Sequence, residues 1–215
     1  ITRRGIKRNC TKNISYMNYY KMIEPNSIRA KLVDVEIVHS EKPRYMVAAI
    51  IEDENSYEHR QNATIVEKGK VASSHFDRES FVKMQFFQYM IANTDWSLDN
   101  KHNLEVIRLD EEKKMIAMPY DFDYSGFVGQ GYAVPHPNLP IKDVHERYFY
   151  SYKVSDEEFD NAINFYKSVE EDLYKLCESA TYMKESTIKE NINYLKSFYK
   201  LLEKPEVFKK RILKR

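Results

Sequence analysis

The sequence is poor in cysteine, glycine and tryptophan, with two, five and one of these residues among 215. The two cysteines, Cys10 and Cys177, lie far apart, so one disulfide is possible but is not implied by their positions. Neither the cysteines nor the six histidines have the spacing of a zinc site. We therefore expect no metal site built from cysteine and histidine.

A long apolar run and a targeting signal are also missing. No stretch approaches the roughly 20 apolar residues that span a bilayer, so no membrane span is expected. No signal peptide is recognisable at the start of the chain. Because the first residue is Ile1 and not methionine, we expect a mature form or an excised piece. A cytoplasmic location is the default expectation, and export stays open.

The sequence has almost no net charge, because 34 basic residues oppose 33 acidic ones and leave +1. This balance argues against a general binder of nucleic acids or acidic substrates. Residues 1–23 differ, since they contain basic side chains and no acid. This segment fits either a solvated terminus or a contact with the phosphate of a nucleotide or a nucleic acid. The basic residues are Arg3, Arg4, Lys7, Arg8, Lys12 and Lys21.

Apolar and aromatic residues, by contrast, are plentiful. Hydrophobic residues make up 42% of the chain and charged residues 31%, which indicates a globular protein and not a disordered one. Seventeen tyrosines and eleven phenylalanines predict a tightly packed, aromatic-rich interior. A chain of 215 residues can form one large domain or two small lobes around a real core.

The first quarter of the chain has mainly strand patterns. Residues 14–23 predict a short helix. Two apolar strand patterns follow at 28–38 and 45–51, and the short polar turn between them predicts a β-hairpin. Residues 54–74 are polar and weakly patterned, so we interpret them as a connecting segment.

The next pattern is a helix followed by a second hairpin. Asp77 is a good N-cap, and apolar residues at helical spacing predict a helix over 77–92. Strand patterns at 104–109 and 114–118 flank the polar turn 110–113 and predict the hairpin. The helix and the hairpin enclose the segment that is richest in candidate functional residues.

The last part of the chain is a loop and then helices. Residues 124–143 contain three glycines and three prolines, which predicts a long irregular loop of the kind that is often functional. Ser155 and Glu158 form a capping box that opens one long helical pattern. A second helical pattern spans 188–202, and Pro205 suits the first position of a short last helix.

These patterns together predict an α+β fold. A small β-rich part (1–53) is followed by a connector (54–74). A larger, mainly helical part (75–215) then carries the second hairpin.

The stretch from Asn93 to Asn103 joins the predicted helix to the second hairpin. It places Asp95 in a loop and Asn103 at the start of a strand, and the hairpin returns the chain to Asp121. Phosphoryl transfer needs a carboxylate that orients the attacking hydroxyl, and hard oxygen ligands that hold Mg²⁺ against the nucleotide phosphates. An aspartate, an asparagine and a second aspartate in this order can supply both.

The motifs Thr94-Asp95, Asn103 and Pro119-Tyr120-Asp121 resemble, in this order, those of HipA-type kinases in the protein-kinase-like superfamily. The Tyr-Asp-Phe-Asp run from Tyr120 is similar to that of CotH-type spore-coat kinases. The resemblance implies a bilobal protein-kinase-like fold and an atypical bacterial kinase. It also implies that the protein uses Mg²⁺ and ATP to phosphorylate a hydroxyl of a protein or a small molecule.

The resemblance assigns roles to individual residues. Asp95 is the expected catalytic base, and Asn103 and Asp121 are the expected metal ligands. Asn100, five residues after Asp95, has the more usual spacing and stays an alternative to Asn103, which directly opens the strand. Asp123 is likewise an alternative to Asp121. The three aspartates could instead hold metal ions in a phosphoester hydrolase.

Other residues of the motif region have less definite expectations. Asp99 and His102 lie in the loop and could assist the reaction, although His102 also fits a structural role. Trp96 is expected to fill the core.

The N-terminal part would hold the nucleotide from the other side. Lys7 is the candidate phosphate anchor, and the strand that ends at Glu52 would lead into the hinge beside the nucleotide. The sequence contains no glycine-rich loop, and its first acid is Glu24. An inactive, pseudokinase-like binding module is therefore the alternative to an active kinase.

Overall fold

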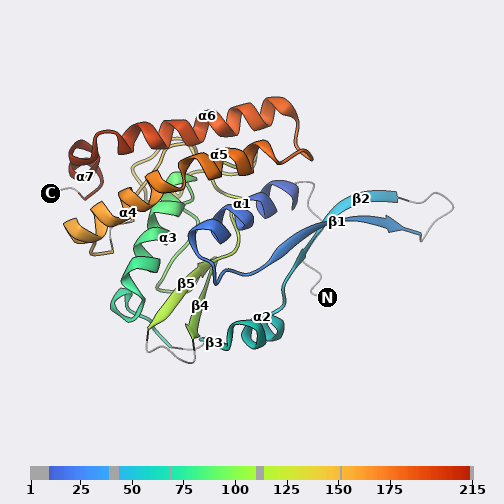
Figure 1. Ribbon diagram of the computed structural model, residues 1–215, viewed down its shortest axis with the longest axis horizontal. Helices are drawn as coiled ribbons and strands as arrows, with labels where there is room; N and C mark the ends of the chain where they lie inside the picture. The colour runs from blue at the N-terminus through green and yellow to red at the C-terminus, as the bar shows by residue number, and fades with distance from the viewer. Residues whose placement is uncertain (1–9, 39–43, 68, 110–113, 151, 214–215) are drawn as a thin grey trace.

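The computed structural model describes residues 10–38, 44–67, 69–109, 114–150 and 152–213, with 10–16 described by their backbone alone. Within these residues the fold is α+β, with seven α-helices, one short 3-10 helix and two small antiparallel sheets (Figure 1). The expected α+β class is confirmed. None of the described helices combines the length and the apolar character that crossing a bilayer requires.

Strands β1 (Ala30–Ile37) and β2 (Arg44–Ile51) form the two-stranded sheet that the sequence predicts. Helix α1 (Cys10–Ile23) contacts both strands, and Figure 1 shows the hairpin reaching away from the remaining helices. Tyr20 on α1 is buried and donates its hydroxyl to the Ala117 carbonyl at 3.0 Å. Helix α1 therefore links the hairpin to the core of the molecule.

Helix α3 (Arg78–Met90) lies at the centre of the core. Its Asp77 cap accepts a hydrogen bond from the Ser80 backbone nitrogen at 3.0 Å, as its position in the sequence predicts. Strands β4 (Leu104–Leu109) and β5 (Met115–Pro119) form the predicted second hairpin, and β5 contacts α3. The hairpin is thereby held against the helix that precedes the motif region.

The core around α3 is aromatic, as the composition predicts. Phe86 is fully buried, and its ring lies 5.2 Å from that of Phe159 and 5.8 Å from that of Tyr166. Phe149 and Phe208 also contact it edge-on. Aromatic pairs at these distances add to the stabilisation that burial alone provides.

Four helices close the chain: α4 (Asp156–Ser168), α5 (Glu170–Glu178), α6 (Glu185–Leu202) and α7 (Pro205–Leu213). The capping box of Ser155 and Glu158 and the first position of Pro205 are both confirmed. The single helical pattern expected after Ser155 is wrong, because it divides at Val169. There the Val169 nitrogen bonds the Tyr166 carbonyl, a tighter turn that ends α4 before α5 begins.

Residues 54–74 contain more structure than their polar pattern indicates. Helix α2 (Glu54–Gln61), strand β3 (Ala63–Ile65) and the 3-10 helix η1 (Ser73–His75) lie within them. Helix α2 has one buried side chain, Tyr57, so an apolar stripe could not reveal it. Strand β3 is only three residues long and exists through its pairing with β4.

Several sequence-based expectations fall outside the described residues. These are the phosphate anchor Lys7, the other basic residues before Cys10, and the turns at 41–43 and 110–113. The division into parts at 1–53, 54–74 and 75–215 stays a prediction. Cys177 is a free, buried thiol.

Candidate functional site

The loop that carries Asp95 begins directly after α3. Ala92 has a φ of 50°, in the left-handed region that alanine seldom adopts, and this turns the chain out of the helix. The side-chain oxygen of buried Asn93 then accepts the Asp95 backbone nitrogen at 3.0 Å. The Tyr150 hydroxyl donates to the Thr94 carbonyl at 3.0 Å, and burial raises the pKa of Tyr150 to about 12. The start of the loop is therefore fixed from both sides.

Trp96 is buried, and its ring contacts Tyr150 edge-on with 5.3 Å between the ring centres. This is the core role that the sequence predicts for it.

Two side chains from the far end of the loop hold Asp95. His102 Nε2 lies 3.1 Å from Asp95 Oδ1. Asn103 Nδ2 donates to the Asp95 backbone carbonyl at 2.7 Å and to Asp95 Oδ2 at 3.0 Å. Each carboxylate oxygen thus has one side-chain partner, and an ionised carboxylate has lone pairs for further donors. The Asp95 side chain is 35% exposed, so a substrate can reach it.

The loop returns to Asp95 through a tight turn. Ser97 and His102 pair across it, with backbone hydrogen bonds of 3.1 and 3.0 Å. Lys101 and Asn103 adopt left-handed φ values of 53° and 52°. The Lys101 ammonium also donates to the Val66 carbonyl at 2.6 Å, which anchors the turn to the segment after β3.

The second hairpin brings Asp121 to the same region. Leu104 pairs with Pro119, and the Tyr120 nitrogen lies 3.4 Å from the Asn103 carbonyl. The chain beyond Asp121 then bonds back to the end of α3. These bonds run from the Gly126 and Phe127 nitrogens to the Ala92 and Ile91 carbonyls, each at 3.1 Å. The structure therefore places the Asp121 segment beside the beginning of the Asp95 loop.

Asp123 is held by an aromatic side chain. The Tyr132 hydroxyl donates to Asp123 Oδ2 at 2.7 Å, and the Tyr132 ring contacts Tyr124 with 5.6 Å between centres. Burial, and then the bond to Asp123, raise the pKa of Tyr132. The Asp123 backbone nitrogen in turn lies 3.3 Å from Asp121 Oδ1. Nothing in the sequence singles out Tyr132, since only the folded loop brings it to Asp123.

Asn100 and Asn103 have different surroundings. Asn100 is exposed, and its side-chain oxygen accepts the His102 backbone nitrogen at 3.3 Å within the turn. Asn103 is partly buried and bonds Asp95 directly. The Asn103 side chain therefore contacts Asp95, the expected base, whereas the Asn100 side chain contacts the backbone of the turn.

Glu52 is bound to arginine. Its two oxygens accept Arg60 Nε and Nη2 at 2.6 and 2.7 Å, and the Arg29 backbone nitrogen donates at 3.0 Å. The Arg60 hydrogen bonds lower the pKa of Glu52. This arrangement fixes the base of the β1–β2 hairpin to α2. Lys7, the residue predicted to act with Glu52 on the nucleotide, lies outside the described residues.

Metal binding by acidic residues alone has no support in the described part of the chain. No group of three or more His, Cys, Asp or Glu side chains within it could hold a metal ion. A site formed from one amide and one carboxylate, such as Asn103 and Asp121, is not a group of this kind, because asparagine is not one of these four residue types. Amide and carboxylate oxygens with added water or phosphate oxygens are suitable ligands for Mg²⁺.

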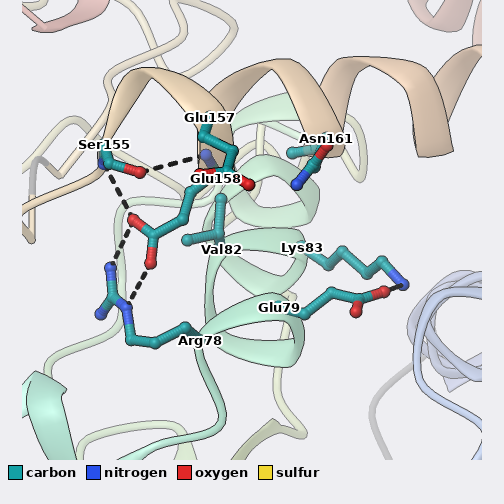
Figure 2. A pocket seen from close by; sticks show the side chains of 9 residues that line it. Arg78, Glu79, Val82, Lys83, Ser155, Glu157, Glu158 and Asn161 are labelled. Carbon is teal, nitrogen blue, oxygen red and sulfur yellow. Dashed lines mark hydrogen bonds and ion pairs between the residues drawn. The ribbon is translucent and has the colours of Figure 1, made fainter.

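A hollow of about 370 Å³ lies elsewhere, between α3 and α4. Figure 2 shows Arg78 paired with Glu158, and Lys83 paired with Glu79 along one edge. The charges at its wall are therefore largely engaged with one another. None of the candidate residues of the motif region lines it.

The geometry thus defines a carboxylate–amide site at the junction of a helix and a β-hairpin. Comparison with known proteins finds no family model and no curated protein that matches the chain. The proposed function accordingly depends on these residues and their arrangement.

Proposed function

We propose that this protein is an atypical, protein-kinase-like phosphotransferase that uses Mg²⁺ and ATP. The observation that carries the proposal is the direct contact between Asp95 and Asn103. The pairing of Leu104 with Pro119 adds to it, because it brings Tyr120 opposite Asn103, and Asp121 is the next residue along the chain. Phosphoryl transfer depends on positioning and electrostatic stabilisation more than on covalent chemistry by the protein. A base held next to metal ligands meets that requirement.

The orientation of the Asn103 amide supports its role as a ligand. Both atoms that contact Nδ2, the carbonyl and the carboxylate of Asp95, are hydrogen-bond acceptors. Only the NH₂ end of the amide can face them, so the assignment of nitrogen and oxygen follows from chemistry. The side-chain oxygen consequently faces away from Asp95. That oxygen is the atom able to bind Mg²⁺.

Each motif residue has one role in the proposal. Asp95 orients the acceptor hydroxyl and takes its proton, while Asn103 and Asp121 hold Mg²⁺ against the phosphates. Asp123, fixed by the Tyr132 hydroxyl, supports the Asp121 segment. The acceptor is a hydroxyl of a protein or a small molecule.

A bilobal arrangement is part of the same proposal. The β1–β2 hairpin would belong to the smaller lobe, with Glu52 leading from it into α2. Lys7 would contact the phosphates from that side. The nucleotide would then bind between the hairpin and the Asp95 loop.

Measuring nucleotide binding and turnover separately distinguishes the proposed role of Asp121 from that of Asp95. We expect Asp121→Ala to abolish the stabilisation that Mg-ATP gives the protein, because the metal loses a ligand. We expect Asp95→Ala to keep this stabilisation but to lower phosphoryl transfer at least about a hundredfold. Thermal shift with and without Mg-ATP, and release of ADP, measure the two effects.

The control is Glu190→Ala, since Glu190 is an exposed acid on α6, outside the motif region. It should change neither measurement. Unchanged Mg-ATP stabilisation in Asp121→Ala would show that the metal assignment is wrong.

An inactive, pseudokinase-like binding module is the second candidate. Acids of the N-terminal part that could pair with a phosphate-anchoring lysine have other partners. Both Glu52 oxygens bond Arg60, and Glu24 accepts the Ser80 hydroxyl at 2.6 Å and the Asn26 nitrogen at 3.1 Å. Absence of any Mg-ATP shift in the wild-type chain would favour this module over an active enzyme.

A further inference from the structure

His102 contacts Asp95, yet none of the roles proposed above for the transfer reaction involves His102. Its Nε2 lies 3.1 Å from Asp95 Oδ1, on a side chain that is 52% exposed. An ionised aspartate can only accept hydrogen bonds, so Nε2 is the protonated ring nitrogen in this contact. We propose that His102 is a positioning residue that fixes the Asp95 carboxylate for its work as the base. The inference rests on the proposed phosphotransferase function.

The fold places His102 on Asp95 through local backbone geometry. The paired backbone bonds between Ser97 and His102 close the turn, and the Asn100 side chain adds a bond to the His102 nitrogen. Lys101, in the left-handed region, immediately precedes His102. A non-glycine residue in that region costs conformational energy, and such outliers cluster at functional sites.

The contact complements the one from Asn103. With Asn103 alone, Oδ2 would be held and the carboxylate could still turn about its Cβ–Cγ bond. The bond to His102 holds Oδ1 as well, so the plane of the carboxylate is fixed. A base must present a lone pair to the acceptor hydroxyl in one orientation, and loss of that orientation slows the reaction. His102 therefore acts on the rate of transfer through Asp95.

A second histidine–aspartate pair in the chain serves as a control for the contact between His102 and Asp95. His145 contacts Asp143 at 2.6 Å, and the His145 side chain is 56% exposed, close to the value for His102. This second aspartate–histidine pair does not involve the proposed base. Removing its histidine controls for the general loss of a surface contact between histidine and aspartate.

The test compares four variants by turnover of Mg-ATP. We expect His102→Leu to lower kcat between about tenfold and a hundredfold, with little change in the KM for Mg-ATP. His102→Gln should retain most of the activity, because its amide nitrogen can take the place of Nε2. His102→Asn, which is too short to reach Oδ1, should behave like His102→Leu, and His145→Leu should behave like the wild type. Melting temperatures of all variants separate loss of positioning from loss of folding.

A spectroscopic measurement tests the contact without turnover. In protein with ¹⁵N-labelled histidine, His102 should show a protonated Nε2 whose resonance moves in Asp95→Ala and stays in place in Glu190→Ala. An unmoved resonance in Asp95→Ala, or wild-type kcat in His102→Leu, would overturn the role of His102. If the wild-type chain has no Asp121-dependent turnover, the phosphotransferase proposal itself fails, whatever the resonances show.

Discussion

Arg147 links the end of α3, just before the motif region, to helix α6. Its guanidinium donates to the Met90 carbonyl at the end of α3, to the Tyr194 carbonyl and to the Ser197 hydroxyl, at 2.9 to 3.0 Å. It also lies 4.2 Å from the centre of the Tyr194 ring. Burial lowers the pKa of Arg147. A cation near the C-terminus of α3 is favourable for the helix dipole as well.

Replacing Arg147 should therefore cost stability. Arg147→Met would break the three hydrogen bonds, two of them part-buried, and would remove the cation from the Tyr194 ring, which should destabilise the fold by about 3 kcal/mol. Urea denaturation measures the change.

Two further variants make this experiment specific. Arg147→Lys should recover little, because an ammonium cannot reproduce the planar donor set or the ring stacking. The exposed Arg108 on β4 is the control, and Arg108→Met should stay within about 0.5 kcal/mol of the wild type. Equal losses in the two Met variants would contradict the role of Arg147.

The sequence predicted residues that could be chosen from the helix and strand patterns beside them. It missed residues whose contacts join segments far apart in the chain. Asp95, Asn103 and Asp121 could be chosen because they follow recognisable helix and strand patterns. The bonds of Arg147 to α3 and α6 join residues 47 to 57 positions apart, and no local pattern reports them. His102 was named from the sequence as a loop residue that could assist the reaction. Its contact with Asp95 was not predicted, because it depends on the left-handed conformations of Lys101 and Asn103.

Among the elements, α3 and α4 are joined at their first turns by an ion pair. Arg78 Nε lies 2.7 Å from Glu158 Oε1, and Nη2 lies 3.1 Å from Oε2 (Figure 2). The hydrogen bonds from Arg78 lower the pKa of Glu158. Glu158 also closes the capping box of α4. The Glu158 carboxylate thus both caps the N-terminus of α4 and joins α4 to α3.

This ion pair predicts a pH-dependent contribution to stability. Since the folded-state pKa of Glu158 is lowered, the contribution is present above the unfolded-state value and is lost as the pH falls through the folded-state value. Glu158→Gln keeps a residue suited to the capping box but removes the charge. It should cost about 1 kcal/mol at neutral pH, and the difference from the wild type should shrink as the pH falls and be lost below the folded-state pKa of Glu158.

Thermal melts of both proteins between pH 7 and pH 3 measure the effect. Glu157→Gln, one position earlier and exposed, should show no such dependence. A difference that persists unchanged at the lowest pH would exclude Glu158 ionisation as its cause.

Elements with an apolar periodicity were predictable, and elements held by caps or partners were not. Helix α3 shows its buried face in the sequence, and Asp77 marks its start. Helix α2 depends on the Asp53 cap, which accepts the Ser56 nitrogen at 3.1 Å, and it buries only Tyr57. Strand β3 needs β4 as a partner before its three residues become a strand. Such information lies in the tertiary structure and not in a local pattern.

For the whole molecule, the β1–β2 hairpin stands apart, because it extends away from the helices that close the chain (Figure 1). Two-stranded sheets gain little stability by themselves. Large apolar side chains of the hairpin region are nevertheless exposed, and contiguous exposed apolar patches bind other apolar groups. They are Val38, Tyr45, Val47, Ile50 and Ile51.

This exposure predicts binding of an apolar dye. Val47 and Ile51 are 40% and 52% exposed and point to the same face of β2. The double variant Val47→Thr, Ile51→Thr should lower fluorescence of the dye ANS, while each change alters stability by no more than about 0.5 kcal/mol.

Val207 on α7 provides the comparison, since it is 64% exposed outside the hairpin. Val207→Thr should leave dye fluorescence nearly unchanged. A large drop in melting temperature of the double variant would indicate that the two β2 side chains are packed and not exposed.

The bonds that hold Asp95 span only seven and eight residues, from His102 and Asn103. Closing so short a loop costs little chain entropy, and contacts of low sequence separation form early in folding. The arrangement around Asp95 can therefore be established before β1 and β2 find their places on α1. Variation in the hairpin should then leave the geometry of the Asp95 carboxylate as it is.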